Sequence, residues 1–365
     1  MLYFVVLTHA CNLRCSYCGY GEEDSGSATS EVSYTVDELR RFLVQDPEPS
    51  IIFYGGEPLV RKPLMKNIMK SIPAYRYLLQ TNALNLADLE SEYLQRFDAI
   101  LVSIDGRDKT TDAYRGKGIY DRILDNLRSI RKKGFKGDLI ARMTASEKTD
   151  IYLDVMHLVE LTDPHFDHVH WQLDALWDSP PELRWTNFDK WIAESYNPGI
   201  VKLVKNWGTE ILTRTKILPI VPFNGVMHTL LTGAKIGLRC GSGIDSFAVS
   251  LNGDITVCPI APEWGFAKVG TIFDSRPEEL PYKVRIGEPC TYCEISGLCG
   301  GRCLFANKTK LWGENGFRTV CESTRAMIDQ LSKFKQSVMH KISRKELFED
   351  DFKSMPFNNG TEIIP

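Results

Sequence analysis

The chain has 365 residues, 43% of them hydrophobic and 25% charged, so it can bury a large core as one barrel with an appendage or as two domains. Its formal net charge of −3 gives no electrostatic reason to expect nucleic acid or an anionic membrane as a partner. No apolar run approaches the roughly 18 residues of a membrane-spanning helix, and the short apolar start lacks the basic segment of a secretion signal.

The ten cysteines fall into two groups, one between residues 11 and 18 and the other between residues 240 and 321. The long stretch between the groups contains none. A secreted protein of this length rarely clusters its disulfide cysteines in this way, so we expect metal ligation in a reducing cytoplasm.

The first group has the spacing CxxxCxxC at Cys11, Cys15 and Cys18, directly after an apolar stretch, 3–7, that is typical of a buried strand. Three thiolates on one short loop can hold three corners of a cubane iron–sulfur cluster and leave the fourth iron open to a small molecule. A zinc site is the alternative, because His9 is near enough in sequence to supply a fourth ligand.

Strands and helices alternate after this loop. Residues 21–33 are small and polar, and Thr35 with Glu38 forms a capping box that predicts the start of a helix. Further strands are expected at 51–54, 77–80, 100–104, 139–143 and 169–173, and further helices at 62–71, 88–97, 120–133 and 149–161. This alternation predicts an α/β fold with a parallel sheet, whose functional residues gather at the carboxyl ends of the strands.

Polar residues and glycines lie at or beyond the ends of several of these strands. Each alone is explained as a turn, a helix cap or a surface side chain, but together they mark one edge of the sheet. They are Gly55, Gly56, Glu57, Thr81, Asn82, Ser103, Asp105, Arg115 and Arg142.

The alternation stops at about residue 175. Pro180 and Pro181 mark a boundary, and two or three helices are expected up to about residue 235. Tryptophans are concentrated in and near this region, where they could line a peptide groove, although packing in the core is favoured for each of them. They are Trp171, Trp177, Trp185, Trp191 and Trp207.

The second cysteine group contains the run CxxCxxxxxCxxxC, flanked by single cysteines on both sides. A zinc ribbon would use only two pairs and leave Cys240, Cys258 and Cys321 without a role. A tail helix at 322–348, charged and solvated, and an unstructured end at 358–365 complete the chain.

With Tyr17 before the last cysteine of the first group and the Gly-Gly-Glu-Pro sequence about 40 residues later, the chain resembles the radical S-adenosylmethionine (SAM) family. The second cysteine group resembles the SPASM pattern of the family's peptide-modifying branch, which is related to anaerobic sulfatase-maturating enzymes and thioether-forming maturases. The resemblance implies a partial (β/α)6 TIM-type barrel over 1–175, a helical connection over 176–235, a SPASM domain over 236–325 and a C-terminal helix and tail over 326–365.

The resemblance also implies the ligands. Three 4Fe-4S clusters are expected: one that binds SAM at Cys11, Cys15 and Cys18, an inner auxiliary cluster at Cys240, Cys258 and Cys303, and an outer one at Cys290, Cys293, Cys299 and Cys321. SAM contacts are expected at Tyr17, Gly55, Gly56, Glu57, Thr81, Asn82, Ser103, Asp105, Arg115 and Arg142. In particular, the two glycines expose carbonyls and Glu57 a carboxylate to the SAM amino group, while Arg115 pairs with its carboxylate.

The inner auxiliary cluster has only three cysteines. Its fourth iron is either open to a substrate atom, such as a peptide thiolate, or bound by an oxygen ligand such as Asp245, Asp254 or water. Both alternatives remain open from the sequence.

The function implied is reductive cleavage of SAM to a 5′-deoxyadenosyl radical that oxidatively modifies a peptide, for example with a thioether or C–C crosslink. Two alternatives are a formylglycine-type dehydrogenase and an iron–sulfur electron carrier without SAM chemistry. The first is disfavoured because Pro259 occupies the position at which those enzymes carry an aspartate base. The catalytic acid or base is unassigned, with His9, Gln172 and Asp174 as candidates that are expected to face the cavity.

The expected partners are a precursor peptide and an electron donor such as flavodoxin or ferredoxin. Because the chain starts at the first strand, we also expect leader recognition to be absent or to be done by a separate protein. A cytoplasmic location is expected.

Overall fold

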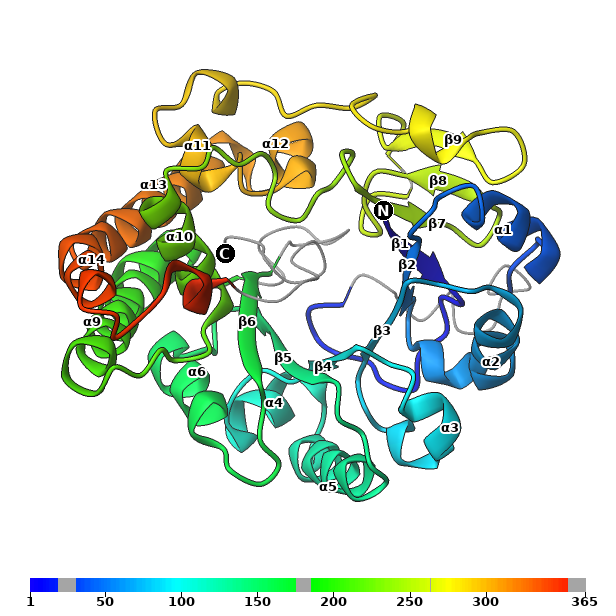
Figure 1. Ribbon diagram of the computed structural model, residues 1–365, viewed down its shortest axis with the longest axis horizontal. Helices are drawn as coiled ribbons and strands as arrows, with labels where there is room; N and C mark the ends of the chain where they lie inside the picture. The colour runs from blue at the N-terminus through cyan, green and yellow to red at the C-terminus, as the bar shows by residue number, and fades with distance from the viewer. Residues whose placement is uncertain (19–30, 175–184, 263, 354–365) are drawn as a thin grey trace.

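The computed structural model describes residues 1–18, 31–174, 185–262 and 264–353. In these residues a nine-stranded sheet has the order β6-β5-β4-β3-β2-β1-β7-β8-β9 and curves around a central space as a partial barrel (Figure 1). The strands are β1 (Leu2–Val6), β2 (Ser50–Tyr54), β3 (Arg76–Thr81), β4 (Ala99–Ser103), β5 (Asp138–Ala145), β6 (His168–Leu173), β7 (Ser246–Val249), β8 (Asp254–Thr256) and β9 (Lys268–Thr271).

Both faces of the parallel strands are buried, as their continuous apolar runs predict. In β1, Tyr3 and Val5 belong to the large core between the sheet and the outer helices. Leu2 and Phe4 point to the other face and join a small apolar layer inside the barrel, with Ile52, Leu78, Ala99, Leu101, Ile140 and Ala248. This inner layer lies inside the barrel and supports the residues of the candidate site.

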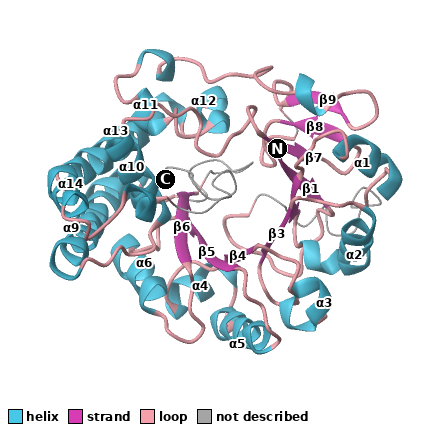
Figure 2. Cartoon of the chain, in the orientation of Figure 1, coloured by secondary structure: helices cyan, strands magenta, loops and turns pink. Residues whose placement is uncertain are grey.

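Helices cover the outer face of the barrel (Figure 2). Thr35 caps the first helix with the predicted capping box, since its hydroxyl accepts from the Glu38 amide at 3.2 Å and the Glu38 carboxylate accepts from the Thr35 amide at 2.7 Å. The helices of this layer are α1 (Val36–Leu43), α2 (Lys62–Ser71), α3 (Ser91–Leu94), α4 (Asp108–Arg115), α5 (Ile119–Lys132) and α6 (Ile151–Glu160).

Two expectations about this layer are wrong in detail. The helix expected at 88–97 is reduced to α3 at Ser91–Leu94, preceded by a single 3-10 turn at Leu86–Asp88. Helix α4 was not expected at all, although it is the element that carries Arg115. Its polar sequence gives little periodic signal, because the helix buries mainly threonine, tyrosine and arginine side chains.

The segment that follows the barrel extends the sheet. Strand β7 pairs in parallel with β1, and β8 and β9 add antiparallel strands beyond it. These strands were not predicted, because each has only three or four residues and β7, on which the other two build, gains its place in the sheet by docking on β1. The proposed boundary between the barrel and the cysteine-rich region therefore lies within one continuous sheet.

The remaining helices close the side of the barrel beyond β6 (Figure 1). They are α8 (Phe188–Trp191), α9 (Asn197–Arg214), α10 (Val221–Thr232), α11 (Ser296–Cys299), α12 (Leu304–Thr309), α13 (Gly313–Ser332) and α14 (Lys335–Ser343). The single solvated helix expected at 322–348 is wrong: it is two helices, and α13 buries Val320, Met327, Ile328 and Leu331 against α9 and α10.

Trp171, Trp185, Trp191 and Trp207 are all buried in the core, as favoured for each. Trp177, Pro180, Pro181, most of the stretch 21–33 and the end at 358–365 lie outside the described residues. In the part of the chain that is described, no helix is long and apolar enough to cross a membrane.

Candidate active site

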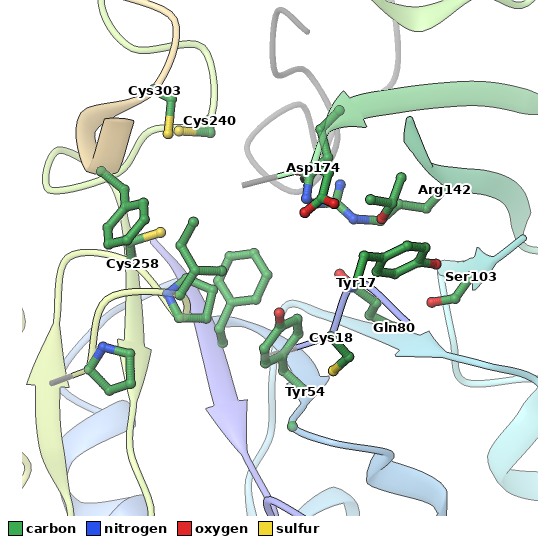
Figure 3. Close-up of a pocket in the computed structure, with 18 of the residues that line it drawn as sticks. Tyr17, Cys18, Tyr54, Gln80, Ser103, Arg142, Asp174, Cys240, Cys258 and Cys303 are labelled. Atoms are coloured by element: carbon green, nitrogen blue, oxygen red, sulfur yellow. Dashed lines mark hydrogen bonds between the residues drawn. The ribbon is translucent and has the colours of Figure 1, made fainter. Parts of the chain in front are cut away.

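A cavity of about 340 Å³ opens at the carboxyl ends of the barrel strands. It is lined from one side by Cys11, Cys15 and Cys18, and from the other by Cys240, Cys258 and Cys303. Figure 3 shows the second set facing Tyr17, Ser103 and Arg142 across the cavity. The fold therefore brings residues more than 200 positions apart in the chain into one space.

The cysteine loop is held by the two glycines after β2. The amide of Gly56 donates to the Thr8 carbonyl at 2.8 Å, and the amide of Glu57 donates to the Ala10 carbonyl at 2.9 Å. A Cβ atom on Gly55 would overlap the Thr8 carbonyl, and one on Gly56 would overlap the carbonyls of the loop after β1. Glycine is therefore required by the close approach of the two loops.

Glu57 lies behind this loop and does not line the cavity. Its Oε1 accepts from the Leu59 amide at 2.9 Å and the Thr81 hydroxyl at 2.8 Å, and its Oε2 accepts from the Asn82 amide at 2.7 Å. Burial raises the pKa of Glu57 to about 7, although the three donors oppose the shift. The expected direct contact to a SAM amino group is not supported by this position, which ties the ends of β2 and β3 together instead.

Asn82 connects this network to the cysteine loop. Its side-chain amide donates to Asn12 Oδ1 at 2.7 Å and lies 3.8 Å from the sulfur of Cys11. The Leu13 amide also donates to that sulfur, at 3.4 Å. Burial raises the pKa of Cys11 to about 11, so the bare thiol is neutral and a cationic centre is needed to make it a thiolate.

A second network holds the other end of the loop. Arg115 Nε and Nη2 donate to the two oxygens of Asp105, at 2.7 and 2.9 Å, in a bidentate ion pair. The Tyr17 hydroxyl and the Thr144 amide donate to the same carboxylate, at 2.8 and 3.0 Å. All four acceptor positions of Asp105 are filled, and both members of the pair are buried.

The role expected for Arg115, pairing with the SAM carboxylate, stays a prediction, but its guanidinium is already engaged within the protein. Two of its nitrogens are occupied by Asp105, its Nη1 is 4.0 Å from the sulfur of Cys15, and its guanidinium lies over the Tyr17 ring at 5.5 Å. Arg115 lines the cavity, but its guanidinium already binds the Asp105 carboxylate. Asp105 does not line the cavity, so both residues position the loop.

The side chains that point into the cavity come from the inner face of the barrel strands. They include Gln80 of β3, Ser103 of β4, Arg142 of β5 and Gln172 of β6, and Arg142 Nη2 donates to Gln172 Oε1 at 3.0 Å. Burial lowers the pKa of Arg142. The Oε1 atom of Gln80 is buried without a hydrogen-bond partner, which leaves an acceptor for a ligand with N–H or O–H groups.

His9 and Asp174 also line the cavity, as do Thr81 and Asn82. Asp174 is buried at the end of β6, where its carboxylate accepts from the Ser146 hydroxyl at 3.2 Å. It is the only Asp or Glu among the described residues that line the cavity.

The later cysteines divide between two cavities. Cys290, Cys293, Cys299 and Cys321 line a second cavity of about 320 Å³, and Cys303 lines both. N–H groups approach several sulfurs: the Ala306 amide is 3.4 Å from Cys303, and Asn307 Nδ2 and Arg325 Nη2 are each 3.6 Å from a cysteine of the second cavity. Such donors are the usual surroundings of iron–sulfur thiolates.

Neither Asp245 nor Asp254 lines the cavity of Cys240, Cys258 and Cys303, and the Asp254 carboxylate pairs with Lys268 Nζ at 2.7 Å. All ten cysteines are free of disulfides. Within the described residues, no three Cys, His, Asp or Glu side chains converge as they would around one metal ion.

Residues 5–150 match the model of the radical SAM superfamily. The first part of the chain is a radical SAM domain. It is the domain of an enzyme superfamily, as the first cysteine group and the glycine motif predict.

Among curated relatives, the chain is 24% identical over 374 residues to a serine-type anaerobic sulfatase-maturating enzyme of Bacteroides thetaiotaomicron, covering 86% of this chain and 84% of the relative. A pre-heme d1 synthase of Dinoroseobacter shibae is 33% identical over 165 residues, which is 43% of this chain. This chain spans only 39% of that synthase, and other relatives of 32–34% identity are also covered over less than half of their lengths.

The fold is shared with solved structures. A structure of anSMEcpe with bound AdoMet and the Cp18Cys peptide superposes with a TM-score of 0.67 at 18% identity, covering 93% of this chain and 99% of that one. SuiB of Streptococcus suis bound to the precursor peptide SuiA superposes with a TM-score of 0.55 at 15% identity, covering 83% and 71%. At these identities the likeness concerns the fold.

The radical SAM domain thus gathers most of the predicted residues at one end of its barrel. Among the lining residues outside the predicted set are Tyr54 and Gln80. Both lie on the strand face that alternation assigns to the barrel interior, together with Ile52 and Leu78, so the period of two residues is the signal that could have found them.

Proposed function

We propose that this protein is a radical SAM enzyme that oxidatively modifies a peptide, with the help of two auxiliary iron–sulfur clusters. The observation that carries the proposal is the single cavity lined by the three cysteines of the first loop and by Cys240, Cys258 and Cys303. A cofactor bound at the first loop and a substrate held beside the second set share this space.

The cluster at Cys11, Cys15 and Cys18 would supply an electron to SAM, and SAM would supply the radical that removes a hydrogen atom from the substrate. The three thiols on one short loop and the N–H groups near the Cys11 sulfur fit such a group. The chain's own contribution is to hold the loop, through the glycines after β2 and through the Asp105–Arg115 ion pair.

Arg142, Ser103 and Gln80 are proposed to bind SAM itself. Arg142 lines the cavity next to Gln172, whereas the guanidinium of Arg115 already holds Asp105, so Arg142 is better placed than Arg115 to bind a carboxylate. The unpartnered Oε1 of Gln80 suits an N–H donor, such as an ammonium or an adenine amine.

The two later cysteine sets are proposed to hold auxiliary 4Fe-4S clusters. Cys290, Cys293, Cys299 and Cys321 would ligate the outer cluster fully, and such a cluster can only transfer electrons. Cys240, Cys258 and Cys303 would leave one position of the inner cluster for a substrate atom, since the two aspartates considered as ligands do not line its cavity.

A peptide substrate is supported by the lining of the cavity beside the inner set. Trp264, Phe305, Leu311 and Trp312 form an apolar and aromatic wall there. Similar folds have been solved with peptides bound, the Cp18Cys peptide in anSMEcpe and SuiA in SuiB. The expected product is a crosslinked peptide, such as a thioether or a C–C bond.

A formylglycine-type dehydrogenase remains the second candidate, because the Bacteroides relative acts as a sulfatase-maturating enzyme and aligns over most of both chains. Pro259, next to Cys258, lines the cavity where an acidic base is expected for that chemistry. Asp174 is the carboxylate that could accept a substrate proton in either reaction.

The partners follow from the chemistry. A reductant such as flavodoxin or ferredoxin is proposed to supply electrons in the cytoplasm, and a separate protein is proposed to recognise a precursor leader where one is used.

Mass spectrometry of candidate peptides tests the proposal. The anaerobically reconstituted protein is incubated with SAM, a reductant and small peptides encoded next to its gene, and the C11A/C15A/C18A variant serves as the control. A SAM-dependent loss of 2 Da, with fragments that place a crosslink, is the expected result. A formylglycine residue without a crosslink would select the second candidate. An unmodified peptide together with intact SAM would contradict both and indicate an iron–sulfur electron carrier.

A further inference from the structure

Arg302 occupies the wall between the two cysteine-lined cavities. It lies between Cys299 and Cys303 in sequence, and it lines both cavities, as do Cys303 and Trp312. Its backbone is in the left-handed region, at a φ of 60°, after two glycines that also have positive φ. This turn directs a side chain that is only 9% exposed into the partition between the cavities.

The charge of Arg302 has no counter-ion among the described residues. Its Nε is buried without a hydrogen-bond partner, and no carboxylate of the described chain forms an ion pair with its guanidinium. The guanidinium lies over the ring of Trp312 at 4.8 Å, which holds the side chain in place. A buried cation without a partner is costly, so an anionic group is expected beside it.

The cavities on both sides are where anionic groups are proposed. An iron–sulfur cube bound by cysteine thiolates carries net negative charge, and Arg302 faces one such site on each side.

We propose that Arg302 is a positioning residue that serves as the shared counter-cation of the two auxiliary clusters and sets the reduction potential of both. A fixed positive charge stabilises the cluster that has gained an electron, so it raises the potential of each. Because one charge acts on two neighbouring clusters, it also keeps their potentials close together, which favours the passage of an electron between them.

This inference rests on the proposed auxiliary clusters, and Arg325 provides the matched control. Arg325 lines only the second cavity, where its Nη2 is 3.6 Å from the sulfur of Cys293, and its side chain is 43% exposed. Removing its charge should affect the outer cluster alone. Removing the charge of Arg302 should affect both.

The experiment is a redox titration of the full-length reconstituted protein followed by EPR spectroscopy, with C321A used to assign the outer-cluster signal. In R302Q and R302M both auxiliary midpoint potentials are expected to shift to more negative values, and in R302K both are expected to stay close to wild type. In R325Q only the outer cluster is expected to shift. R302M preserves an apolar stem against Trp312, which separates the loss of charge from the loss of packing.

If R302Q or R302M retains its iron but the midpoint potential of only one auxiliary cluster, or of neither, changes, the inference is overturned. The proposed function is unaffected by that result. If both neutral variants lose the auxiliary clusters, their retention in R302K supports the need for the charge, and their loss in R302K as well overturns it. A wild-type protein with the first cluster alone would contradict the proposed auxiliary clusters and, with them, this inference.

Discussion

The substitution Asp105→Asn removes the charge that four donors share behind the cysteine loop. Arg115 would then be a buried cation without its partner, since the side chains of Arg115 and Asp105 are only 6% and 0% exposed. Breaking a buried ion pair by neutralising one member costs about 3–5 kcal/mol. In asparagine an NH2 group also replaces one of the two carboxylate oxygens and faces two donors. Either Tyr17 or Thr144 therefore loses its acceptor as well.

Urea unfolding under anaerobic conditions, followed by far-ultraviolet circular dichroism, measures this cost. Asp88→Asn is the control, because Asp88 is 68% exposed and meets Lys62 at 3.4 Å, where an ion pair contributes about 0–1 kcal/mol. The iron content of D105N should also fall, since Tyr17 precedes Cys18. The double variant D105N/R115M should be less destabilised than the sum of its single variants, by about 0.5–3 kcal/mol. A D105N cost below about 1 kcal/mol, with strict additivity, would refute a buried clamp.

Three further predictions concern the same end of the barrel. Gly56→Ala should destabilise the protein by about 1–3 kcal/mol and reduce its iron content, because the added methyl group overlaps carbonyls of the loop after β1; Gly265→Ala, with no atom within 4 Å of its Cβ position, should change neither. The free energy of unfolding should fall as pH rises from about 4.5 to about 7, because the unfolded chain releases the Glu57 proton at the ordinary pKa while the folded chain keeps it; the effect is on the order of 3 kcal/mol, and a Glu57→Gln variant that keeps the same slope would contradict it. Arg142→Gln should weaken SAM binding about tenfold to a hundredfold in calorimetric titrations, whereas Arg214→Gln on the exposed face of α9 should not, and equal affinities would remove Arg142 from the SAM site.

Much of the barrel could be predicted from local patterns. The apolar runs of β1 to β6 and the capping box at Thr35 are short-range signals, and the structure confirms both. The roles of the first cysteine group and of Gly55 and Gly56 could also be predicted from the sequence. Each depends on the geometry of one loop or of the ends of two adjacent strands.

The roles of the polar residues at the strand ends were harder to predict. Glu57 and Asp105 lie just past the ends of their strands, outside the alternation that carries Gln80 and Ser103 into the cavity. Apart from the Leu59 amide, which is two positions from Glu57, their partners are 10 to 88 positions away, so no local pattern reveals that their carboxylates are already filled. A strict two-residue alternation along each strand separates the residues that point into the cavity from those that lie beyond the strand end and position the loop.

Strands β7 to β9 could not be predicted for a related reason. Each is three or four residues long, and β7 becomes a strand because its backbone pairs with β1 from Leu2 to Val5. The cavity that joins the two cysteine groups depends on this docking. It is therefore a property of the tertiary structure, even though both groups are plain in the sequence.

The central claim is that iron held by Cys11, Cys15 and Cys18 keeps one coordination position for SAM. The most direct test is to reduce the anaerobically reconstituted protein in the presence of SAM and to quantify 5′-deoxyadenosine and methionine by liquid chromatography. The account predicts that both products form in equal amounts with the wild type and that neither forms with C11A/C15A/C18A. Intact SAM in the presence of a reduced, iron-loaded wild-type protein would contradict it.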